Sequence, residues 1–334
     1  MDDVFEKKNI GVLGAGTWGY AVARHLSNAG HDVTLWSKLP KEILSIESSH
    51  GHPNLPGSSY PENIKLTLDL EEAVSGKDLL FFGTASPYIR STAEEALPFI
   101  SDGTLVVNLA KGIEDKTMLS MSDVLDEVIN KDRVNKIPVG VLSGPTHAEE
   151  VAIDLPTAII AAFKDISDAE VLQDAFTTDR MKVYASDDVD GVELCGALKN
   201  IIAIAVGISA GLGYGDNAKA ALITKGIHEI CLLGTVISCK EKTFYDLAGI
   251  GDLIVTATSE HSRNFTFGKL IGSGKSSEEA FSEIGMVVEG MNALPAALEI
   301  ADKYNLDIPI IRAVDSLVYN KDHIGQVVLD LMRN

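Results

Sequence analysis

The sequence of 334 residues has only three cysteines, Cys195, Cys231 and Cys239, and no CxxC pair. This number and spacing exclude a disulfide framework and argue against a structural zinc site. The eight histidines show no metal-ligand spacing either, so we expect no metal. Aromatic residues are also scarce, at 6%, which predicts a core built mainly from Ala, Val, Ile and Leu.

Basic residues are few. The chain has 28 Lys and Arg against 48 Asp and Glu, for a formal net charge of −20. So acidic a chain lacks the basic face that nonspecific nucleic-acid binding requires, and it is a poor match for an anionic membrane. A small anionic ligand is still possible, but its pocket must be built from specific Lys, Arg and backbone N–H groups.

Long hydrophobic runs are missing as well. The longest, such as residues 201–208, are far shorter than a membrane span. The opening residues 1–6 are acidic and lack the apolar stretch of a signal peptide. We therefore expect no membrane insertion, and a cytoplasmic protein in a reducing compartment.

The first part of the chain alternates short apolar runs with helical stretches, which is typical of a mostly parallel sheet with helices on both faces. The strands are predicted at 9–13, 32–36, 64–68, 79–83, 104–109, 139–143, 157–163 and 181–184. From residue 192 onward we expect no strand. Helices are predicted there at 192–209, 218–239, 265–270, 277–283, 292–304, 308–319 and 323–332.

A glycine pattern follows the first predicted strand directly. Gly14-Ala15-Gly16-Thr17-Trp18-Gly19 is a GxGxxG motif between a strand and a helix, the context that a dinucleotide-binding unit requires. Gly14 permits a tight turn, Gly16 lets the backbone approach a pyrophosphate, and Gly19 lets helix and strand pack closely. We therefore predict a doubly wound α/β domain of Rossmann type at 1–190, binding NAD or NADP, and an all-α substrate and catalytic domain at 191–334.

The end of the second predicted strand bears on the choice of cofactor. An NAD site usually has an acid there to hold the ribose 2′-hydroxyl, whereas this chain has Ser37 and Lys38. These two residues tolerate a 2′-phosphate. The sequence thus predicts that NADPH is accepted as well as NADH.

Later motifs combine into a specific pattern, and the combination resembles the NAD(P)-dependent glycerol-3-phosphate dehydrogenase family over about residues 9–330. The motifs are Ala110-Lys111-Gly112, residues 142–150 (LSGPTHAEE), Gly196-Ala197-Leu198-Lys199-Asn200, residues 211–220 (GLGYGDNAKA), residues 248–253 (AGIGDL), Ser262-Arg263-Asn264 and Val287-Val288-Glu289-Gly290. The resemblance implies an enzyme that interconverts dihydroxyacetone phosphate and sn-glycerol 3-phosphate and feeds glycerophospholipid synthesis.

The resemblance also implies roles for particular residues. Lys199 matches the family's proton donor and acceptor, and Lys111 matches a second active-site lysine that touches both cofactor and substrate. The further substrate contacts are Gly144, Thr146, Asp252, Thr256, Ser262, Arg263 and Asn264. The further cofactor contacts are Ala148, Arg263, Val287 and Glu289. The chain departs from the family at two places. The family often has Arg or Asp near the positions of Ser37 and Lys38, and it usually has Val-Pro-Ser where this chain has Ala85-Ser86-Pro87.

The residue chemistry is consistent with this expectation. Reduction of a ketone leaves a developing alkoxide that needs a proton, and a buried lysine can supply it. Lys199 lies in an apolar helical stretch, where a lysine either reaches the rim or is functional. Its neighbour Asn200 faces another direction, so we expect it to contact the cofactor or the backbone. Arg263 follows a predicted loop at 256–262, and its planar guanidinium suits a phosphate.

Two alternatives remain open at this stage. Another 3-hydroxyacid-type NAD(P)-dependent dehydrogenase also joins a Rossmann domain to helices and uses a helical lysine, but it binds a carboxylate or acyl group. A non-catalytic NAD(P)-responsive regulator would bind cofactor without turnover. His147 resembles a catalytic base, but we expect it on the cofactor side because Lys199 already fills that role. A homodimer is expected as the commonest symmetric assembly.

Overall fold

The computed structural model describes residues 6–260 and 262–319, and contacts divide the chain into two compact units. The first unit runs to residue 110 and resumes at 119–189. The second takes 111–118 together with the described residues from 190 onward. The contiguous division predicted from the sequence did not anticipate the segment 111–118.

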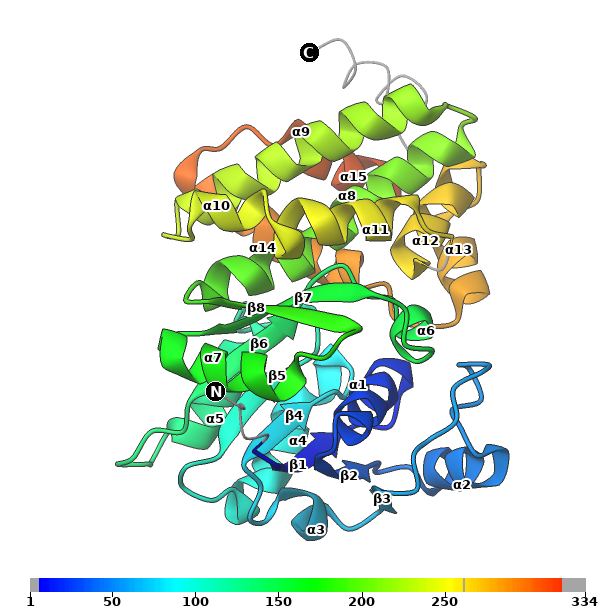
Figure 1. The fold of residues 1–334 in the computed structure, drawn as a ribbon. Coiled ribbons are helices and arrows are strands. Elements are labelled where there is room, and N and C mark those ends of the chain that lie inside the picture. Colours follow the sequence, from blue (N-terminus) through cyan, green and yellow to red (C-terminus); the bar gives the residue numbers. More distant parts are fainter. Residues whose placement is uncertain (1–5, 261, 320–334) are drawn as a thin grey trace. The chain divides into compact units, whose positions relative to one another are not determined.

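The first unit is built on one eight-stranded sheet with the order β3-β2-β1-β4-β5-β6-β7-β8 (Figure 1). Among its described strands, β6 and β7 pair antiparallel and every other neighbouring pair is parallel, so the predicted mostly parallel sheet is confirmed. The strands are β1 (Asn9–Leu13), β2 (Asp32–Trp36), β3 (Ile64–Thr67), β4 (Leu79–Phe82), β5 (Leu105–Asn108), β6 (Val139–Ser143), β7 (Thr157–Phe163) and β8 (Met181–Ser186).

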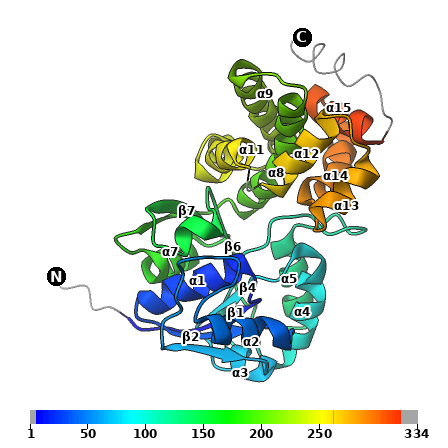
Figure 2. The ribbon, with the colours of Figure 1, turned by 90° about the vertical axis from the view of Figure 1, so that its right-hand side faces the viewer.

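Helices cover both faces of this sheet (Figure 2). Because side chains alternate along a strand, Ile10 and Val12 pack with α1 and α7 on one face. Leu80 and Phe82 pack with α3, α4 and α5 on the other. The helices are α1 (Thr17–Asn28), α2 (Pro40–Ser49), α3 (Leu70–Val74), α4 (Ile89–Ala96), α5 (Met121–Asn130), α6 (Ala148–Val151) and α7 (Ile166–Phe176), with short turns η1 (Ser86–Tyr88) and η2 (Leu97–Phe99).

The strand order reverses at β1, which lies between β2 and β4. In open α/β sheets, ligands bind beyond the carboxyl ends of the strands at such a reversal. The GxGxxG turn lies there, between the end of β1 and the start of α1. The topology therefore places the predicted cofactor motif at the usual binding position of this fold.

The second unit is helical, and none of its described residues lies in a strand, which confirms the expectation for this region. Its elements are α8 (Val189–Gly211), α9 (Asp216–Thr235), α10 (Glu241–Phe244), η3 (Leu247–Gly251), α11 (Asp252–Thr258), α12 (Arg263–Gly272), α13 (Ser277–Ile284), α14 (Glu289–Tyr304) and α15 (Pro309–Tyr319). The predicted loop at 256–262 is wrong in its first part, because α11 continues to Thr258. The predicted helix at 323–332 lies outside the described residues.

Helix α8 forms the centre of this unit. It is long and apolar enough to cross a membrane by length and composition, but 89% of its most apolar window is buried in the protein, so core packing accounts for its composition. Helix α12 packs closely against it through glycines. A Cβ on Gly207 would lie 2.1 Å from the Phe265 carbonyl oxygen, and one on Gly268 would lie 2.1 Å from that of Ile204. The close approach brings the start of α12 beside the middle of α8.

Candidate active site

The three fingerprint glycines differ in their surroundings. Gly14 has φ of 120°, and a Cβ there would lie 2.7 Å from the Gly83 backbone. A Cβ on Gly19 would lie 2.0 Å from the Gly14 carbonyl oxygen. A Cβ on Gly16, by contrast, would meet no atom within 4 Å. Gly14 and Gly19 are thus needed for the turn and its packing, while Gly16 leaves open space in front of the backbone.

That open space belongs to a cavity of about 500 Å³ at the carboxyl ends of β1, β2 and β4. Its lining consists of Gly14, Ala15, Gly16, Trp36, Ser37, Lys38, Leu39, Glu42, Gly83, Thr84, Ala85, Tyr88, Ser91 and Thr92. Helix α1 begins at this cavity without a side-chain cap and without an acid in its first turn, so its N–H groups suit a pyrophosphate. The Thr84 hydroxyl is buried and has no hydrogen-bond partner within the described chain.

These features fit a dinucleotide. Of the predicted residues, Gly14, Gly16, Ser37 and Lys38 line the cavity, while Thr17, Trp18 and Gly19 form the first turn of α1. The sequence prediction missed α2, which supplies Glu42, and it noted the segment after β4 only as a departure from the family pattern at Ala85-Ser86-Pro87, without singling out Thr84. The signal for the segment after β4 was its position beside the strand reversal, once the strand order is known.

Three further predicted contacts follow β6 in the first unit. Gly144 has φ of 156°, and the Thr146 hydroxyl donates to its carbonyl oxygen at 3.2 Å. Ala148 is the first residue of the short helix α6, and His147 precedes it as the N-cap. The structure therefore gathers these residues in one turn, and their contacts with ligands remain predictions.

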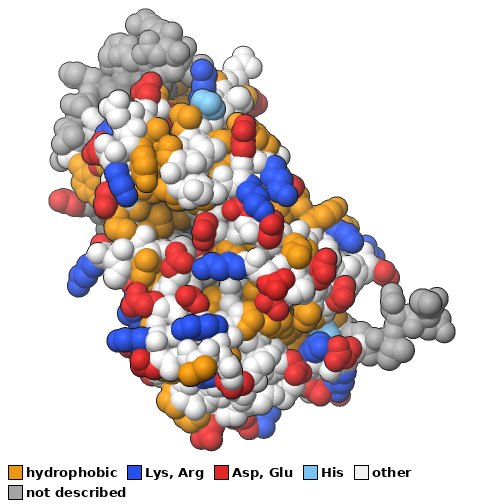
Figure 3. Space-filling model, turned by 90° about the vertical axis from the view of Figure 1, so that its left-hand side faces the viewer, with side chains coloured by type: hydrophobic (Ala, Val, Ile, Leu, Met, Phe, Trp, Pro, Cys, Tyr) orange, Lys and Arg blue, Asp and Glu red, His pale blue; other side chains and the backbone are white. Residues whose placement is uncertain are grey.

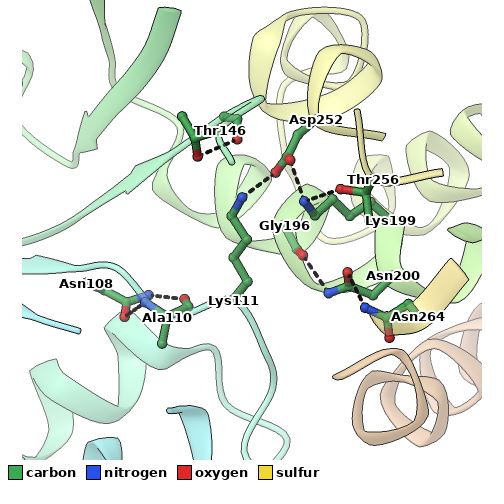
Figure 4. A network of polar contacts seen from close by, with 11 residues as sticks. Asn108, Ala110, Lys111, Thr146, Gly196, Lys199, Asn200, Asp252, Thr256 and Asn264 are labelled. Carbon is green, nitrogen blue, oxygen red and sulfur yellow. Dashed lines mark hydrogen bonds and ion pairs between the residues drawn. The ribbon is translucent and has the colours of Figure 1, made fainter. Parts of the chain in front are cut away.

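A buried cluster of charged residues lies in the second unit (Figure 4). Lys199, on α8, is 4% exposed, and its Nζ donates to Asp252 Oδ1 and, at 2.7 Å, to Thr256 Oγ1. Lys111 Nζ donates to the other oxygen of Asp252 at 2.7 Å. Asp252 and Thr256 are one turn apart on α11 and so share a face. The structure thus brings together four of the residues predicted for catalysis and substrate binding.

The electrostatics of this cluster favour proton exchange. Burial lowers the pKa of the Lys199 ammonium well below its usual 10.5, and the neighbouring Lys111 ammonium lowers it further, while Asp252 acts in the opposite direction. When Lys199 is protonated, two ammonium groups share one carboxylate, which leaves one positive charge in excess. A group that forms a negative oxygen beside Lys199 is therefore stabilised by charge, and it has a proton donor within reach.

Two asparagines form a second network beside this cluster (Figure 4). Asn200 Nδ2 donates to the Gly196 carbonyl oxygen at 3.2 Å, which agrees with the predicted backbone contact. Asn264 Nδ2 donates to Asn200 Oδ1 at 2.9 Å, and the Gly290 N–H donates to Asn264 Oδ1 at 2.9 Å. The network fixes the Asn264 amide and leaves its second N–H available. No sequence pattern indicates the contacts of Asn264, because its partners lie 64 and 26 residues away.

The start of α12 carries the predicted phosphate contacts. Ser262 caps the helix by accepting from the Phe265 N–H at 3.2 Å, and Arg263 is its first residue. Arg263 is exposed, and none of the described residues forms an ion pair with it. Val287 and Glu289 flank the start of α14 in the same unit.

On the surface, acidic and basic side chains are interspersed, as one face of the molecule illustrates (Figure 3).

Fold and polar cluster together define the class of the protein, an oxidoreductase that joins a Rossmann-type dinucleotide-binding sheet to a helical unit with a buried lysine. Two family models match the chain. The N-terminus of NAD-dependent glycerol-3-phosphate dehydrogenase matches residues 9–169, and the C-terminus of the same family matches 188–329. The chain therefore belongs to the NAD-dependent glycerol-3-phosphate dehydrogenase family, as the sequence motifs had indicated.

Individual relatives agree with this assignment. A protein of Lactobacillus delbrueckii subsp. bulgaricus, named glycerol-3-phosphate dehydrogenase (NAD(P)+) 2, is 54% identical over 310 residues, 92% of each chain. One of Agathobacter rectalis with the same enzyme name is 44% identical and covers 97% of this chain and 95% of its own. The crystal structure of glycerol-3-phosphate dehydrogenase from Coxiella burnetii matches with a TM-score of 0.89 at 34% identity, covering 98% of this chain and 99% of that one.

Proposed function

We propose that the protein interconverts dihydroxyacetone phosphate and sn-glycerol 3-phosphate with NAD(H) or NADP(H), and so supplies glycerophospholipid synthesis. The observation that carries this proposal is the buried cluster in which Lys199 and Lys111 share Asp252. Bound reduced nicotinamide supplies a hydride to the substrate ketone. The residues of this chain then have to hold the substrate and provide one proton.

Lys199 is the proposed proton donor. Hydride addition to the carbonyl carbon leaves a negative oxygen, and Lys199 Nζ gives that oxygen a proton. In the reverse direction the neutral amine takes the proton from the alcohol, which the lowered pKa of Lys199 makes accessible near neutral pH. Asp252 and Thr256 orient the amine through their hydrogen bonds. Lys111 adds positive charge for the same oxygen and, by family resemblance, also contacts the cofactor.

The phosphate is assigned to the start of α12. Arg263 offers paired N–H donors in a planar fork, and Asn264 adds the amide N–H that its network leaves available. Ser262 and the helix N-terminus favour a negative group at the same place. Gly144 and Thr146 are proposed as further substrate contacts. Ala148, Arg263, Val287 and Glu289 are proposed as cofactor contacts.

The 3-hydroxyacid dehydrogenase alternative is not favoured, because both family models and the relatives point to glycerol 3-phosphate. The test is a spectrophotometric assay of NADH or NADPH oxidation with dihydroxyacetone phosphate as substrate. We expect turnover with it and little with unphosphorylated dihydroxyacetone. Equal activity on both ketones, or activity on hydroxyacid substrates alone, would contradict the proposal.

A homodimer located in the cytoplasm completes the proposal. Closed dimers are the commonest symmetric assemblies, and the three cysteines are buried and form no disulfide, as suits a reducing compartment. Light scattering on the purified protein tests the assembly, with the mass of a dimer expected. Fractionation of cells tests the location.

A further inference from the structure

An acidic side chain lies at the end of β2 even though the strand itself ends without one. Glu42, in the first turn of α2, lines the dinucleotide cavity. Ser37 Oγ donates to Glu42 Oε2 at 2.5 Å and accepts from the Leu39 N–H at 3.0 Å. Ser37 is 3% exposed, so its hydroxyl is held inside this arrangement. The single hydroxyl proton of Ser37 is therefore already given to a carboxylate.

The one basic residue in the described lining of the cavity is paired with a carboxylate. Lys38 and Glu42 are the two charged residues in the described lining of the cavity. Lys38 Nζ forms an ion pair with Glu95 Oε1, on α4, at 2.6 Å. The charge of Lys38 is therefore matched by that of Glu95. The additional carboxylate of Glu42 makes this corner of the cavity negative.

His52 is held close to Glu42 by hydrogen bonds to the backbone. Burial lowers the pKa of the His52 ring and so disfavours its positive form, while the hydrogen bond to Ala15 and the nearby Glu42 act in the opposite direction. Its Nδ1 accepts from the Asn54 N–H at 3.1 Å, and the ring also hydrogen-bonds to the backbone of Ala15. Both ring nitrogens are thus committed to holding the loop around residue 52 against the fingerprint turn.

We propose that Glu42 is the residue by which this chain distinguishes NAD(H) from NADP(H). Its carboxylate accepts the hydrogen bond of the adenosine ribose 2′-hydroxyl and repels a 2′-phosphate, so NAD(H) is bound more tightly. The inference rests on the proposed function, because it assumes that the cavity binds a nicotinamide dinucleotide. NADP(H), which the sequence predicts to be accepted, is then the weaker of two usable cofactors.

A sequence rule that inspects only the end of the strand misses this acid. Glu42 comes from the following helix and reaches the corner through its bond with Ser37. It lies 23 positions after Gly19, close to the distance of about 20 residues at which dinucleotide folds place an acid for the ribose. The position is thus ordinary for the ribose contact, although the element that supplies the acid is not the strand.

The test is calorimetric titration of NAD+ and NADP+ into the unaltered protein, Glu42→Gln and the control Glu47→Gln, which changes an exposed residue of the same helix outside the cavity lining. We expect the unaltered protein to bind NAD+ at least tenfold more tightly than NADP+. Glu42→Gln should reduce that ratio about tenfold, mainly by tightening NADP+, because the repulsion is removed. Glu47→Gln should leave the ratio unchanged.

The outcomes separate the two proposals. If neither dinucleotide binds the unaltered protein, the proposed function fails. If both bind and the ratio is the same in Glu42→Gln, the role of Glu42 is wrong and the proposed function stands. Ser37→Ala is the second variant, which removes the hydrogen bond that orients Glu42 and should lower the ratio partly. An unchanged ratio in Ser37→Ala, should Glu42→Gln fail to fold, would equally overturn the assignment.

Discussion

The two units differ in the groups that they offer to negatively charged ligands. In the first, the cavity at the fingerprint turn is bounded by glycines, neutral side chains and the N–H groups of α1, with few charges. In the second, Lys199, Lys111 and Asp252 form a buried ionic cluster contributed by three segments far apart in the sequence. At the fingerprint turn, backbone N–H groups are available to hold a pyrophosphate. Titratable side chains are needed where a proton has to move.

The strongest test of this contrast is to remove the proposed proton donor. Lys199→Ala should lower kcat by roughly 10²- to 10⁴-fold, the usual contribution of a general acid–base residue. The affinity for NADH, measured by titration, should change little, because the dinucleotide cavity lies in the first unit. Lys225→Ala, at an exposed position on α9, is the matched control and should keep full activity. Near-normal kcat in Lys199→Ala would remove this residue from the chemistry.

Glu229 is another buried titratable residue of the helical unit, and it predicts how the stability of the protein depends on pH. It is 3% exposed, and its two carboxylate oxygens accept from the N–H groups of Ile310 and Ile311 at the start of α15, at 2.8 and 3.0 Å. Burial raises the pKa of Glu229 from 4.5 to about 7, against the effect of those two hydrogen bonds, and the negative charge of Asp307 adds to the rise. The carboxyl group thus ionises later in the folded protein than in the unfolded chain.

The sign of the resulting pH dependence follows from proton binding. Between pH 4.5 and about 7 the unfolded chain holds fewer protons at this group, so the free energy of unfolding falls as pH rises. The loss is on the order of 3 kcal/mol, at about 1.36 kcal/mol per unit of pKa. Denaturant titrations of the unaltered protein and Glu229→Gln across this range test it. The glutamine of the variant cannot titrate, so its free energy of unfolding should fall less steeply with pH, even though it is lower throughout. Parallel slopes for the two proteins would contradict the raised pKa of Glu229.

Substitution of Arg263 tests whether this exposed cation binds the substrate phosphate. Charge-assisted hydrogen bonds contribute about 1.5–3 kcal/mol, so Arg263→Ala should lower kcat/KM for dihydroxyacetone phosphate by roughly 10- to 100-fold. Arg263→Lys keeps the charge but loses the planar fork, and should restore only part of the loss. The informative comparison is between substrates. If both phosphorylated and unphosphorylated dihydroxyacetone lose the same factor, Arg263 does not bind the phosphate.

Much of the fold could be predicted because the first unit repeats a simple local code. Short apolar runs such as 79–83 and 157–163 became strands with shifts of at most one residue. The fingerprint turn could be predicted because Gly14 and Gly19 are each required by the local backbone, while Gly16 leaves the space that a ligand needs. These requirements come from neighbours in the sequence or from an adjacent strand, so they are visible as a sequence motif.

Most of the unpredicted features depend on contacts between residues that are distant in the sequence. Helix α11 was missed because its glycine-rich lead-in and polar end resemble a loop, and its packing in the core is not visible in the sequence. The residues themselves gave no sign that Lys111 and Lys199 share Asp252, since those bonds span 141 and 53 positions. Their roles came from the family resemblance. Glu42 was missed for a different reason: its bond with Ser37 spans only five positions, but it forms because α2 turns back toward the end of β2, and the sequence pattern does not record that turn.

The smallest expected effect comes from the first unit, and it isolates binding from folding. Gly16→Ala should leave the melting temperature nearly unchanged, because Gly16 has φ of −67° and a Cβ there would meet no atom within 4 Å. The new methyl group would nevertheless project into the cavity at the place where the pyrophosphate approaches the backbone. We therefore expect the affinity for both NADH and NADPH to fall about tenfold, equivalent to about 1.4 kcal/mol, without a change in their ratio.

Gly215→Ala is the matched control, since Gly215 also precedes a helix in extended conformation and a Cβ there would also meet no atom within 4 Å. It should change neither stability nor dinucleotide affinity. Gly19→Ala completes the set, because its Cβ would lie 2.0 Å from the Gly14 carbonyl oxygen and should lower the melting temperature as well as the affinity. If Gly16→Ala binds NADH normally, the backbone at residue 16 is not what the pyrophosphate contacts. The contrast between a backbone-built site and a side-chain-built site would then fail in the first unit.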